Sequence, residues 1–597
     1  MIRLSKILFA IFGVSVALFT SGQQLAFPGA EGYGRFASGG RGNGETGRVV
    51  EVTNLEDDLE NPPEGSLRWA FSQATEKRID PILGIEYTVK LPLTIVFRVG
   101  GVINLIGELR VQRDRMTIAG QTAPGNGICI RGATVNFSGS NNVIVRYIRF
   151  RPGDELGEET SAFRIENGSN FIIDHCSMSW AIEETTHFSS NSNTTVQWCI
   201  ISESLFNSIH KKGERGYATQ WGGQYASYHH NLLAHHNSRM PRINGSNKND
   251  INALVDYRNN VNYNWSSTGA FYGGEFEGTD GNGFCHTNVV NNYFIPGPAT
   301  SSNVIFARPS YNRSGVQVDG YGQWYFNGNV MEGYEAMTND NWLGVDGGNI
   351  PGGKENIRSE EEFVKSDGAL EDYDAYTQSA EEALSDVLAE AGATLPKRDT
   401  IDRRIITEAQ GMIEIVRYEH ISDDDQVTPK KGVESGIIDT QQNLVPEDKQ
   451  DSVTAWDVYT KSTEAPVDAD HDGIPDEWEM DNGLDPNDIT DGRLIAENGY
   501  SNLENYLNGL TLTVAVDDIR SDSHFRIYPN PADHTLYFQT ADKLAQVSLF
   551  DLNGRKLISS ENKEGVTSLS IQTLPNGIYM LQAIGIKRTY SQKVFKK

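Results

Sequence analysis

Basic side chains gather in two short segments of this chain of 597 residues. His210, Lys211 and Lys212 form the first segment, and Arg239 and Arg242 belong to the second. Ammonium and guanidinium groups bind carboxylates, and arginine does so with a fork of parallel donors. The two segments therefore predict a site for an anionic ligand.

Acidic pairs precede both basic segments, at Glu158-Glu159 and at Glu183-Glu184. Carboxylate oxygens are the hard ligands that Ca²⁺ prefers. Glu159, Glu183 and Glu184 are therefore candidates for binding a cation. A bound cation and a local basic patch would offset the net charge of −29, which otherwise repels an anionic polymer and also disfavours nucleic acid as a partner.

A third acidic segment lies nearer the C-terminus and has the spacing of an EF-hand loop, with a glycine at position 6 of twelve. The predicted calcium ligands are Asp468, Asp470, Asp472, the backbone carbonyl of Ile474, Asp476 and Glu479. Pro475 and Trp478 suit a rigid packed loop, and no basic or nucleophilic residue accompanies it. We therefore expect this calcium to be structural.

The basic segments and the acidic pairs must be positioned by short strands rich in β-branched or aromatic residues. Such strands return every 23 to 37 residues, with no amphipathic helix between them. They end on Ile148, Cys176, Cys199, Asn231, Asn260, Asn292 and Asn329. This spacing predicts an all-β parallel β-helix, in which each coil buries the apolar face of the next and the asparagines bond one another between coils. Asn-rich loops of a β-sandwich are the alternative.

The cysteines and the N-terminus indicate the cellular compartment. Cys176 and Cys199 lie on neighbouring anchors, so we expect buried thiols rather than a disulfide, and no metal-ligand spacing links the four cysteines. Residues 1–22 combine Arg3 and Lys6, an apolar run and a small-residue break, which is typical of a signal peptide. The protein is predicted to be exported, with no membrane span in the mature chain.

Several motifs in order carry a family resemblance: FPGAEGYG, TIAGQTAPGNGI, NVIVRYIRFRPGD, IIDHCSMSW, VQWCIISESL and HHNLLAHHNSRMPRI. Together they resemble a secreted bacterial pectate lyase of polysaccharide lyase family 1, over roughly residues 26–440. The resemblance implies a right-handed parallel β-helix and calcium-dependent β-elimination of a polyuronate, with pectate as the expected substrate. FPGAEGYG superficially contains a dinucleotide-type pattern, but a glycine-rich loop fits it better, since no strand precedes it.

The resemblance also suggests roles for the basic residues. Arg239 matches the first arginine of the family's Arg-x-Pro motif, which implies that it removes the proton on C5 of the uronate. A guanidinium is protonated at working pH, so this role needs desolvation, a neighbouring cation such as Arg242, or a bridging water. Simple binding of the substrate carboxylate is the alternative. Lys212 matches a lysine of the family's catalytic site. His210, Lys211 and Arg242 are expected to bind substrate. The alternative for Lys211 and Lys212 is a solvated lysine pair without a role in binding.

The chain departs from the family at the calcium site. Ser161 stands where relatives carry aspartate, and Glu183-Glu184 replaces Asp-Glu. We therefore expect a weaker calcium site or calcium that arrives with the substrate. Asp174 is interpreted as structural. A glycoside hydrolase that uses Glu183 with Glu184 or Asp174, a lyase for another polyuronate, and a non-catalytic glycan-binding solenoid stay open as alternatives.

The remaining segments complete the predicted organisation. The β-helix domain covers residues 23–445 with a helical cap near 378–412, followed by a linker at 446–466 and the calcium-binding segment at 467–512. Residues 520–597 alternate like a small β-sandwich and begin near Tyr528-Pro529-Asn530-Pro531, which resembles the C-terminal sorting domain of the Bacteroidetes type IX secretion system. A carbohydrate-binding module is the alternative. We expect a monomer whose partners are an acidic plant or algal polysaccharide and the secretion machinery.

Overall fold

The computed structural model describes residues 23–42, 46–267, 269–276, 283–302, 304–311, 320–364, 377–412, 417–418, 429–430, 435–446, 448–517, 525–529, 532–540, 543–550, 556–561, 567–585 and 589–597. The predicted signal peptide, residues 1–22, lies outside this set. None of the described helices is long and apolar enough to cross a membrane.

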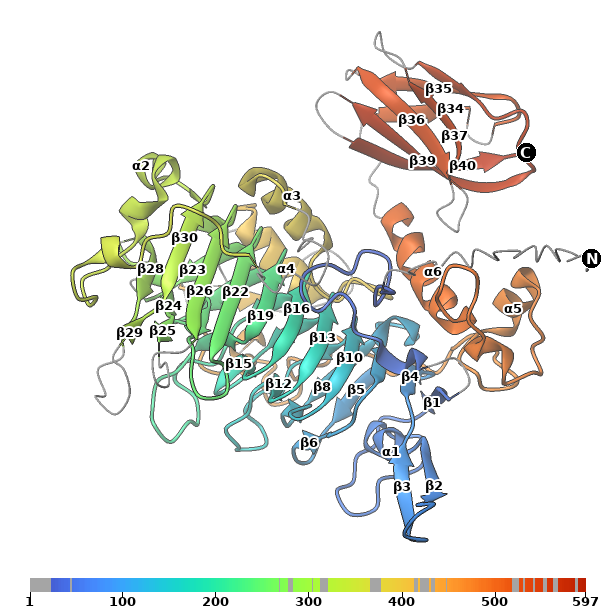
Figure 1. The fold of residues 1–597 in the computed structure, drawn as a ribbon, viewed down its shortest axis with the longest axis horizontal. Coiled ribbons are helices and arrows are strands. Elements are labelled where there is room, and N and C mark those ends of the chain that lie inside the picture. Colours follow the sequence, from blue (N-terminus) through green and yellow to red (C-terminus); the bar gives the residue numbers. More distant parts are fainter. Residues whose placement is uncertain are drawn as a thin grey trace, which may run out of the picture.

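Three long parallel sheets form the main body, and each coil of chain contributes one strand to each sheet (Figure 1). In spatial order, the first sheet contains β1 (Arg48–Val52), β4 (Leu93–Phe97), β7 (Met116–Ala119), β10 (Asn141–Arg146), β13 (Ser169–Asp174), β16 (Ser192–Gln197), β19 (Gln224–His229), β22 (Asn252–Arg258), β26 (Phe284–Val290) and β30 (Gln323–Asn327). The second sheet contains β31 (Val330–Met331), β27 (Tyr293–Ile295), β23 (Val261–Trp265), β20 (Leu232–His236), β17 (Ile200–Ser202), β14 (Ser177–Ser179), β11 (Arg149–Phe150), β8 (Ile128–Arg131) and β5 (Gly101–Asn104). The third sheet contains β28 (Ile305–Pro309), β24 (Gly269–Gly273), β21 (Arg242–Asn244), β18 (Tyr217–Gly222), β15 (Glu184–Ser189), β12 (Phe163–Glu166), β9 (Val135–Asn136) and β6 (Leu109–Arg110).

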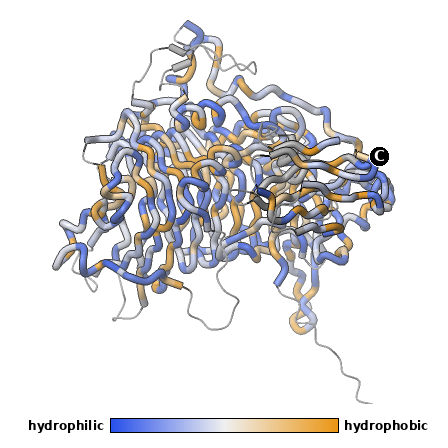
Figure 2. Tube along the Cα trace, turned by 90° about the horizontal axis from the view of Figure 1, so that it is seen from above, coloured by the Kyte–Doolittle hydropathy of each residue, from blue (hydrophilic) through white to orange (hydrophobic). Residues whose placement is uncertain are grey.

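Alternation along each strand creates the core. Val145, Ile173 and Val196 occupy the same register on β10, β13 and β16 and are fully buried inside the stack. Because side chains alternate across a strand, every second residue faces inward and stacks on its equivalent in the next coil. Figure 2 shows apolar segments recurring from coil to coil. The predicted all-β fold, a right-handed parallel β-helix with short capping helices and a small C-terminal β-sandwich, is confirmed.

An asparagine ladder closes one corner of the coils. The backbone N–H of Asn231 donates to Oδ1 of Asn260 at 2.9 Å, and the pattern continues to Asn292 at 2.8 Å and Asn329 at 3.0 Å. Asn341, in the 3-10 helix η3 (Asn341–Gly344), ends the ladder at 2.9 Å from the Asn329 backbone nitrogen. The predicted bonding between coils is confirmed. The four cysteines are free and buried, as expected.

The FPGAEGYG segment lies across the outer face of the first sheet. Tyr33 N donates to Ser227 Oγ at 3.0 Å, and Gly34 N donates to Thr195 Oγ1 at 2.8 Å. A Cβ at Gly34 would meet the Phe171 carbonyl oxygen at 1.9 Å, so only glycine allows this close approach. The segment is a packed loop, not a dinucleotide site.

Two helices follow where the sequence predicted them. Ser379 forms a capping box at the start of α3 (Ala380–Glu390), and α4 is Thr400–Ala409. The helices pack against the outer face of the second sheet, where Val387, Ile401 and Ile405 join Ile200 and Leu232 in one apolar cluster. They therefore cover a side of the solenoid and not its end, and α2 (Glu335–Asn339) with η3 follows the last coil (Figure 1).

The outer elements are short. They are α1 (Leu67–Ser72), the hairpin β2 (Thr75–Ile79) with β3 (Glu86–Lys90), β25 (Glu275–Phe276), β29 (Gly320–Tyr321), β32 (Arg417–Tyr418), β33 (Pro429–Lys430), η1 (Gly39–Arg41), η2 (Gly120–Thr122), η4 (Lys354–Asn356), η5 (Gln441–Leu444), α5 (Asp476–Asn482), η6 (Asp491–Arg493) and α6 (Asn502–Asp517). The C-terminal strands are β34 (Phe525–Tyr528), β35 (Thr535–Thr540), β36 (Leu544–Phe550), β37 (Lys556–Glu561), β38 (Ser568–Ser570), β39 (Gly577–Gly585) and β40 (Thr589–Lys596). They form two antiparallel sheets around one apolar cluster. The predicted Asn553-Gly554 turn lies outside the described residues.

Candidate active site

A row of polar side chains crosses the outer face of the third sheet, one residue from each coil. The row is Asn136, Arg164, His187, Gln220, Arg242, Tyr272 and Arg308, each in register with the next. Their strand neighbours Phe188, Trp221 and Ile243 are fully buried in the core. Period-two alternation therefore directs the row outward and gives this face one polar side chain per coil.

Arg239 lies in the turn between β20 and β21, close to the middle of that row. Its φ of +66° is in the left-handed region, which a non-glycine residue adopts at a cost. Its guanidinium lies over the Tyr217 ring, 4.1 Å from the centroid, donates to Gln220 Oε1 at 3.2 Å and forms an ion pair with Glu184. Two coils therefore fix the position of this side chain, which is only 15% exposed.

Glu184 joins Arg239 to a histidine on the same strand. Burial raises the pKa of Glu184, but contacts with His187 and Arg239 outweigh burial and lower the pKa to about 2. Burial acts in the opposite sense on His187, whose pKa is nevertheless raised by hydrogen bonds to Glu166 and Glu184. The centre of the face is therefore a chain of alternating charges. Each acidic group is held ionised by a neighbouring cation.

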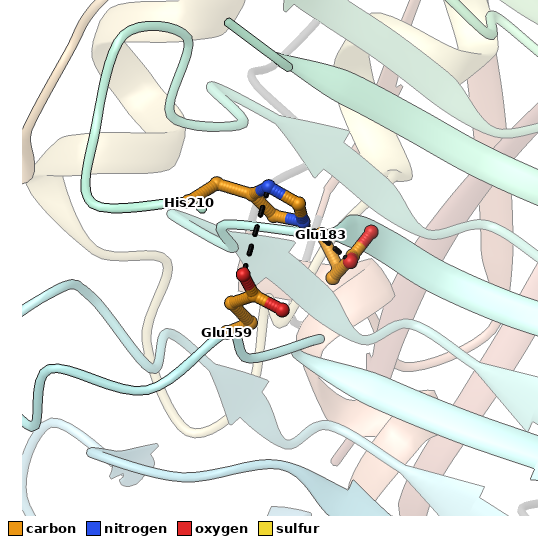
Figure 3. A group of neighbouring side chains, drawn as sticks. All are labelled: Glu159, Glu183 and His210. Atoms are coloured by element: carbon orange, nitrogen blue, oxygen red, sulfur yellow. Dashed lines mark hydrogen bonds and ion pairs between the residues drawn. The ribbon is translucent and has the colours of Figure 1, made fainter. Parts of the chain in front are cut away.

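Glu159, Glu183 and His210 form a second group beside the row (Figure 3). His210 Nε2 lies 2.6 Å from Glu183 Oε1, and Nδ1 lies 3.7 Å from Glu159 Oε1. The Lys212 N–H donates to His210 Nδ1 at 2.9 Å, so that nitrogen accepts and Nε2 carries the proton that it donates to Glu183. The ring thus orients the Glu183 carboxylate.

His210 itself is predicted to contact substrate, but its side chain is buried in this structure. Its side chain is 1% exposed because the loop of residues 206–216 folds over it. The lysines that follow are exposed: Lys211 Nζ pairs with Glu159 Oε2 at 2.8 Å, and Lys212 lies beside it on the same turn. Sequence alone did not reveal that the histidine is buried whereas the two lysines after it are exposed.

Two further predicted residues have charged partners. Arg242 lies 3.3 Å from Glu275 and donates to Asn244 Oδ1 at 3.0 Å, with its side chain 20% exposed. Glu184, predicted to be a calcium ligand with Glu159 and Glu183, lies instead with Arg239 and is not part of their cluster among the described residues. The reason is its strand: Glu184 begins β15, whereas Glu183 lies before it.

Glu159 and Glu183 suit a hard cation, because their carboxylates converge and remain 24% and 28% exposed. Two carboxylates supply fewer than the six to eight oxygens that Ca²⁺ takes, so water or an anionic ligand must complete the set. Ser161 adds none, because it is buried and its N–H donates to Thr134 Oγ1 at 3.0 Å.

Asp174 lies elsewhere, in the first sheet. Its carboxylate is fully buried and accepts from Arg146 Nε at 2.7 Å and Gln197 Nε2 at 2.8 Å. Burial raises its pKa, but His175 and Arg146 lower it well below the usual range. The structural role predicted for Asp174 is confirmed, and this residue cannot pair with Glu183 in hydrolysis.

The third acidic group is the Asp-rich loop before α5. Asp468, Asp470 and Asp472 converge, and Asp472 also converges with Glu479 and Asp491. Asp491 was missed because it lies outside the twelve-residue loop. Asp476, a predicted ligand, differs: its Oδ1 accepts from the Ala469 N–H at 2.7 Å and closes the loop on itself. The Ile474 carbonyl stays a predicted ligand.

Similarity to known proteins covers most of the chain. "Probable pectate lyase C" of Aspergillus terreus is 32% identical over 514 residues, which is 85% of this chain and 98% of that protein. "Probable pectate lyase C" of Emericella nidulans is 34% identical over 487 residues, covering 81% and 93%. The solved structure of jun a 1, the major allergen from cedar pollen, has a TM-score of 0.40 and 16% identity, and covers 61% of this chain and 92% of that chain. Residues 526–597 match the secretion system C-terminal sorting domain.

A solenoid of three parallel sheets, with arginines and paired carboxylates on one face, defines a parallel β-helix protein. The chain belongs to the pectate lyase family, as its full-length relatives show. Its tail is a type IX sorting domain that marks the protein for export, as predicted.

Proposed function

We propose that the protein cleaves pectate by calcium-assisted β-elimination at the outer face of the third sheet. The observation that carries this proposal is the placement of Arg239 between Glu184 and Gln220, beside the converging carboxylates of Glu159 and Glu183. Elimination must remove the C5 proton of a uronate whose carboxylate opposes its loss. A base next to a cation site meets that requirement.

Each residue has a proposed task. Ca²⁺ held by Glu159 and Glu183 would neutralise the substrate carboxylate and so make the C5 proton more acidic. Arg239 takes the C5 proton, the C4–O bond breaks as the C4–C5 double bond forms, and the leaving oxygen takes a proton from water. Lys212 contacts the carboxylate at the reacting sugar. Arg242 and Lys211 bind neighbouring carboxylates, exchanging Glu275 and Glu159 for substrate.

The ion pair with Glu184 bears directly on the base role. A carboxylate beside a guanidinium favours its protonated form, so Glu184 must release Arg239 before that side chain accepts a proton. A polyuronate between them would compete for the guanidinium with its own carboxylates. Binding of substrate and activation of the base are therefore the same event in this proposal.

Hydrolysis would need one carboxylic acid that stays protonated near neutral pH. Glu184 has its pKa lowered to about 2, and Asp174 lies in another sheet. Neither residue meets the requirement. A monomeric enzyme that meets its polymer outside the cell, after delivery by the sorting tail, is the arrangement we propose.

The test follows near-ultraviolet absorbance of unsaturated uronide from polygalacturonate, with calcium and with excess chelator. Wild type should produce the chromophore only with calcium, and Arg239→Ala should be slower by about 10²–10⁴-fold. Arg164→Ala, in the same outward row but three coils away from Arg239, is the matched control and should keep most activity. Reducing ends without absorbance would sink elimination. An unchanged Arg239→Ala rate would remove Arg239 from the chemistry.

A further inference from the structure

Five carboxylates converge in residues 468–491, away from the third sheet. Asp468, Asp470 and Asp472 offer ligand atoms within 4.8 Å of one another, and so do Asp472, Glu479 and Asp491. The two groups share Asp472, so they form one site. Two segments of chain meet there: the EF-hand-like loop and the turn that begins η6.

Burial separates this group from an ordinary acidic surface. Asp468, Asp472, Glu479 and Asp491 are 4%, 2%, 0% and 8% exposed. Both carboxylate oxygens of Glu479 are buried without a hydrogen-bond partner among the described residues, and the same holds for Asp470 Oδ2, Asp472 Oδ2 and Asp491 Oδ1. Buried ionised groups are costly unless they are paired or bind a metal. These oxygens point into a space that a cation would fill.

The surrounding charges do not balance the group. Arg98 Nη1 reaches Asp468 Oδ2 at 3.9 Å, but its Nε lies closer to Glu51, at 3.2 Å. His471, in the loop itself, turns its ring to Glu51 at 2.8 Å. The site thus has strong excess negative charge for a small cation to neutralise.

The donor set selects the cation. All five side chains offer oxygen, with neither histidine nor cysteine among them, and oxygen donors favour Ca²⁺ over Zn²⁺. Asp476 is engaged with Ala469. Asp491, twelve residues beyond Glu479 in sequence, supplies a carboxylate that the loop alone lacks.

The loop also fastens two distant parts of the chain together. Ile474 is fully buried and packs with Val96 of β4, Ala119 of β7 and Leu503 of α6. Gly473 has φ of +93°, and a Cβ there would lie 3.0 Å from Val49 Cγ1 of β1. The loop therefore sits on the outer face of the first sheet at its first coils. That edge has no preceding coil to cover it.

We propose that Asp468, Asp470, Asp472, Glu479 and Asp491 bind one Ca²⁺ and that this ion locks residues 467–517 onto the first coils of the β-helix. The ion joins the Asp-rich loop to the turn before α6, and Ile474 and α6 hold the joined unit against β4 and β7. This calcium is separate from the one proposed for catalysis.

The test uses the exported full chain without its signal peptide. Calcium binding is measured by titration calorimetry, and thermal unfolding is recorded with calcium and with excess chelator. Wild type should bind one calcium tightly in the absence of substrate, and calcium should raise Tm by on the order of 5 °C. Asp491→Asn should lose both effects and unfold like the wild type in chelator. Asp488→Asn is the matched control, because Asp488 is exposed and bonds Thr490 in its own turn.

Limited proteolysis tests whether calcium holds residues 467–517 against the first coils of the β-helix. Chelator should expose cleavage sites within residues 467–517 in the wild type, and Asp491→Asn should show them even with calcium. Glu159→Gln, at the catalytic site, should leave tight binding and the Tm response intact, which separates failure of this proposal from failure of the lyase proposal. Equal calcium responses in Asp491→Asn and wild type would overturn the site. A lost calcium response with unchanged proteolysis would overturn the lock.

Discussion

Two acidic clusters in this protein differ in what faces their carboxylates. Beside the third sheet, Glu183 pairs with His210, and Glu159 pairs with Lys211. In the Asp-rich loop, Glu479 and Asp491 keep buried oxygens without partners among the described residues. The carboxylates of the first cluster have partners in their own chain, and those of the second would gain theirs from the proposed cation.

This difference suggests that the two clusters should bind Ca²⁺ with different affinities. A carboxylate that already has a lysine or arginine partner must give up that partner to bind Ca²⁺, which weakens the site. A weak site suits a cation that is shared with a passing polymer and released with the product. A buried cluster without partners suits a cation that stays through the life of the protein.

Replacing one glutamate by glutamine in each cluster should give the largest effect, because each variant should change one calcium-dependent measurement and leave the other unchanged. Glu183→Gln should raise the calcium concentration for half-maximal lyase activity by about 10- to 100-fold and leave the calcium-dependent Tm rise unchanged. Glu479→Gln should abolish that rise and keep activity at saturating calcium. Activity against calcium concentration and Tm with and without calcium are the two readouts. If both variants changed both readouts, the clusters would not be independent.

Removing the partner of Arg239 should sharpen the comparison. Glu184→Gln takes away the carboxylate that favours a protonated guanidinium, so at saturating calcium the activity should reach its plateau at a pH lower by about one to two units. The measurement is initial rate against pH. Glu166→Gln is the control, because Glu166 contacts His187 and Arg164 instead of Arg239. An unmoved profile would argue that Arg239 only binds substrate.

Low pH should destabilise the β-helix through two buried histidines, independently of either acidic cluster. Burial lowers the pKa of His230 to about 4 and that of His236 to about 3. Both are depressed below the unfolded value near 6.5, so their neutral forms favour the folded state above that pH, and this stability is lost as pH falls toward 4. Each histidine should contribute a slope of up to about 1.4 kcal/mol per pH unit. Denaturant unfolding at pH 7 and pH 5, with calcium present, measures it; equal stability would contradict it.

Much of the fold was predictable from sequence because coils repeat their local chemistry. Asparagine at successive turns and β-branched strands indicated the stack, and the Ser379 capping box indicated α3. The pairing of Arg239 with Glu184 spans 55 residues and depends on the register between coils, which no local pattern encodes. Asp491 was missed for the same reason, since it reaches the Asp-rich loop from a separate turn. The burial of the His210 ring could not be predicted, because burial of one ring in a basic loop leaves no sequence signal.

The asparagine ladder limits how this protein can change its length. The side-chain oxygens of Asn260, Asn292 and Asn329 each accept a hydrogen bond from the backbone N–H of the asparagine one coil earlier. A partial coil would place no asparagine at the matching turn and would break the ladder. An insertion or deletion inside the stack is therefore tolerated only as a whole coil that brings its own amide, whereas loops beyond the sheets are free to vary. The face that meets the polymer should grow or shrink in steps of one strand spacing, about 4.8 Å.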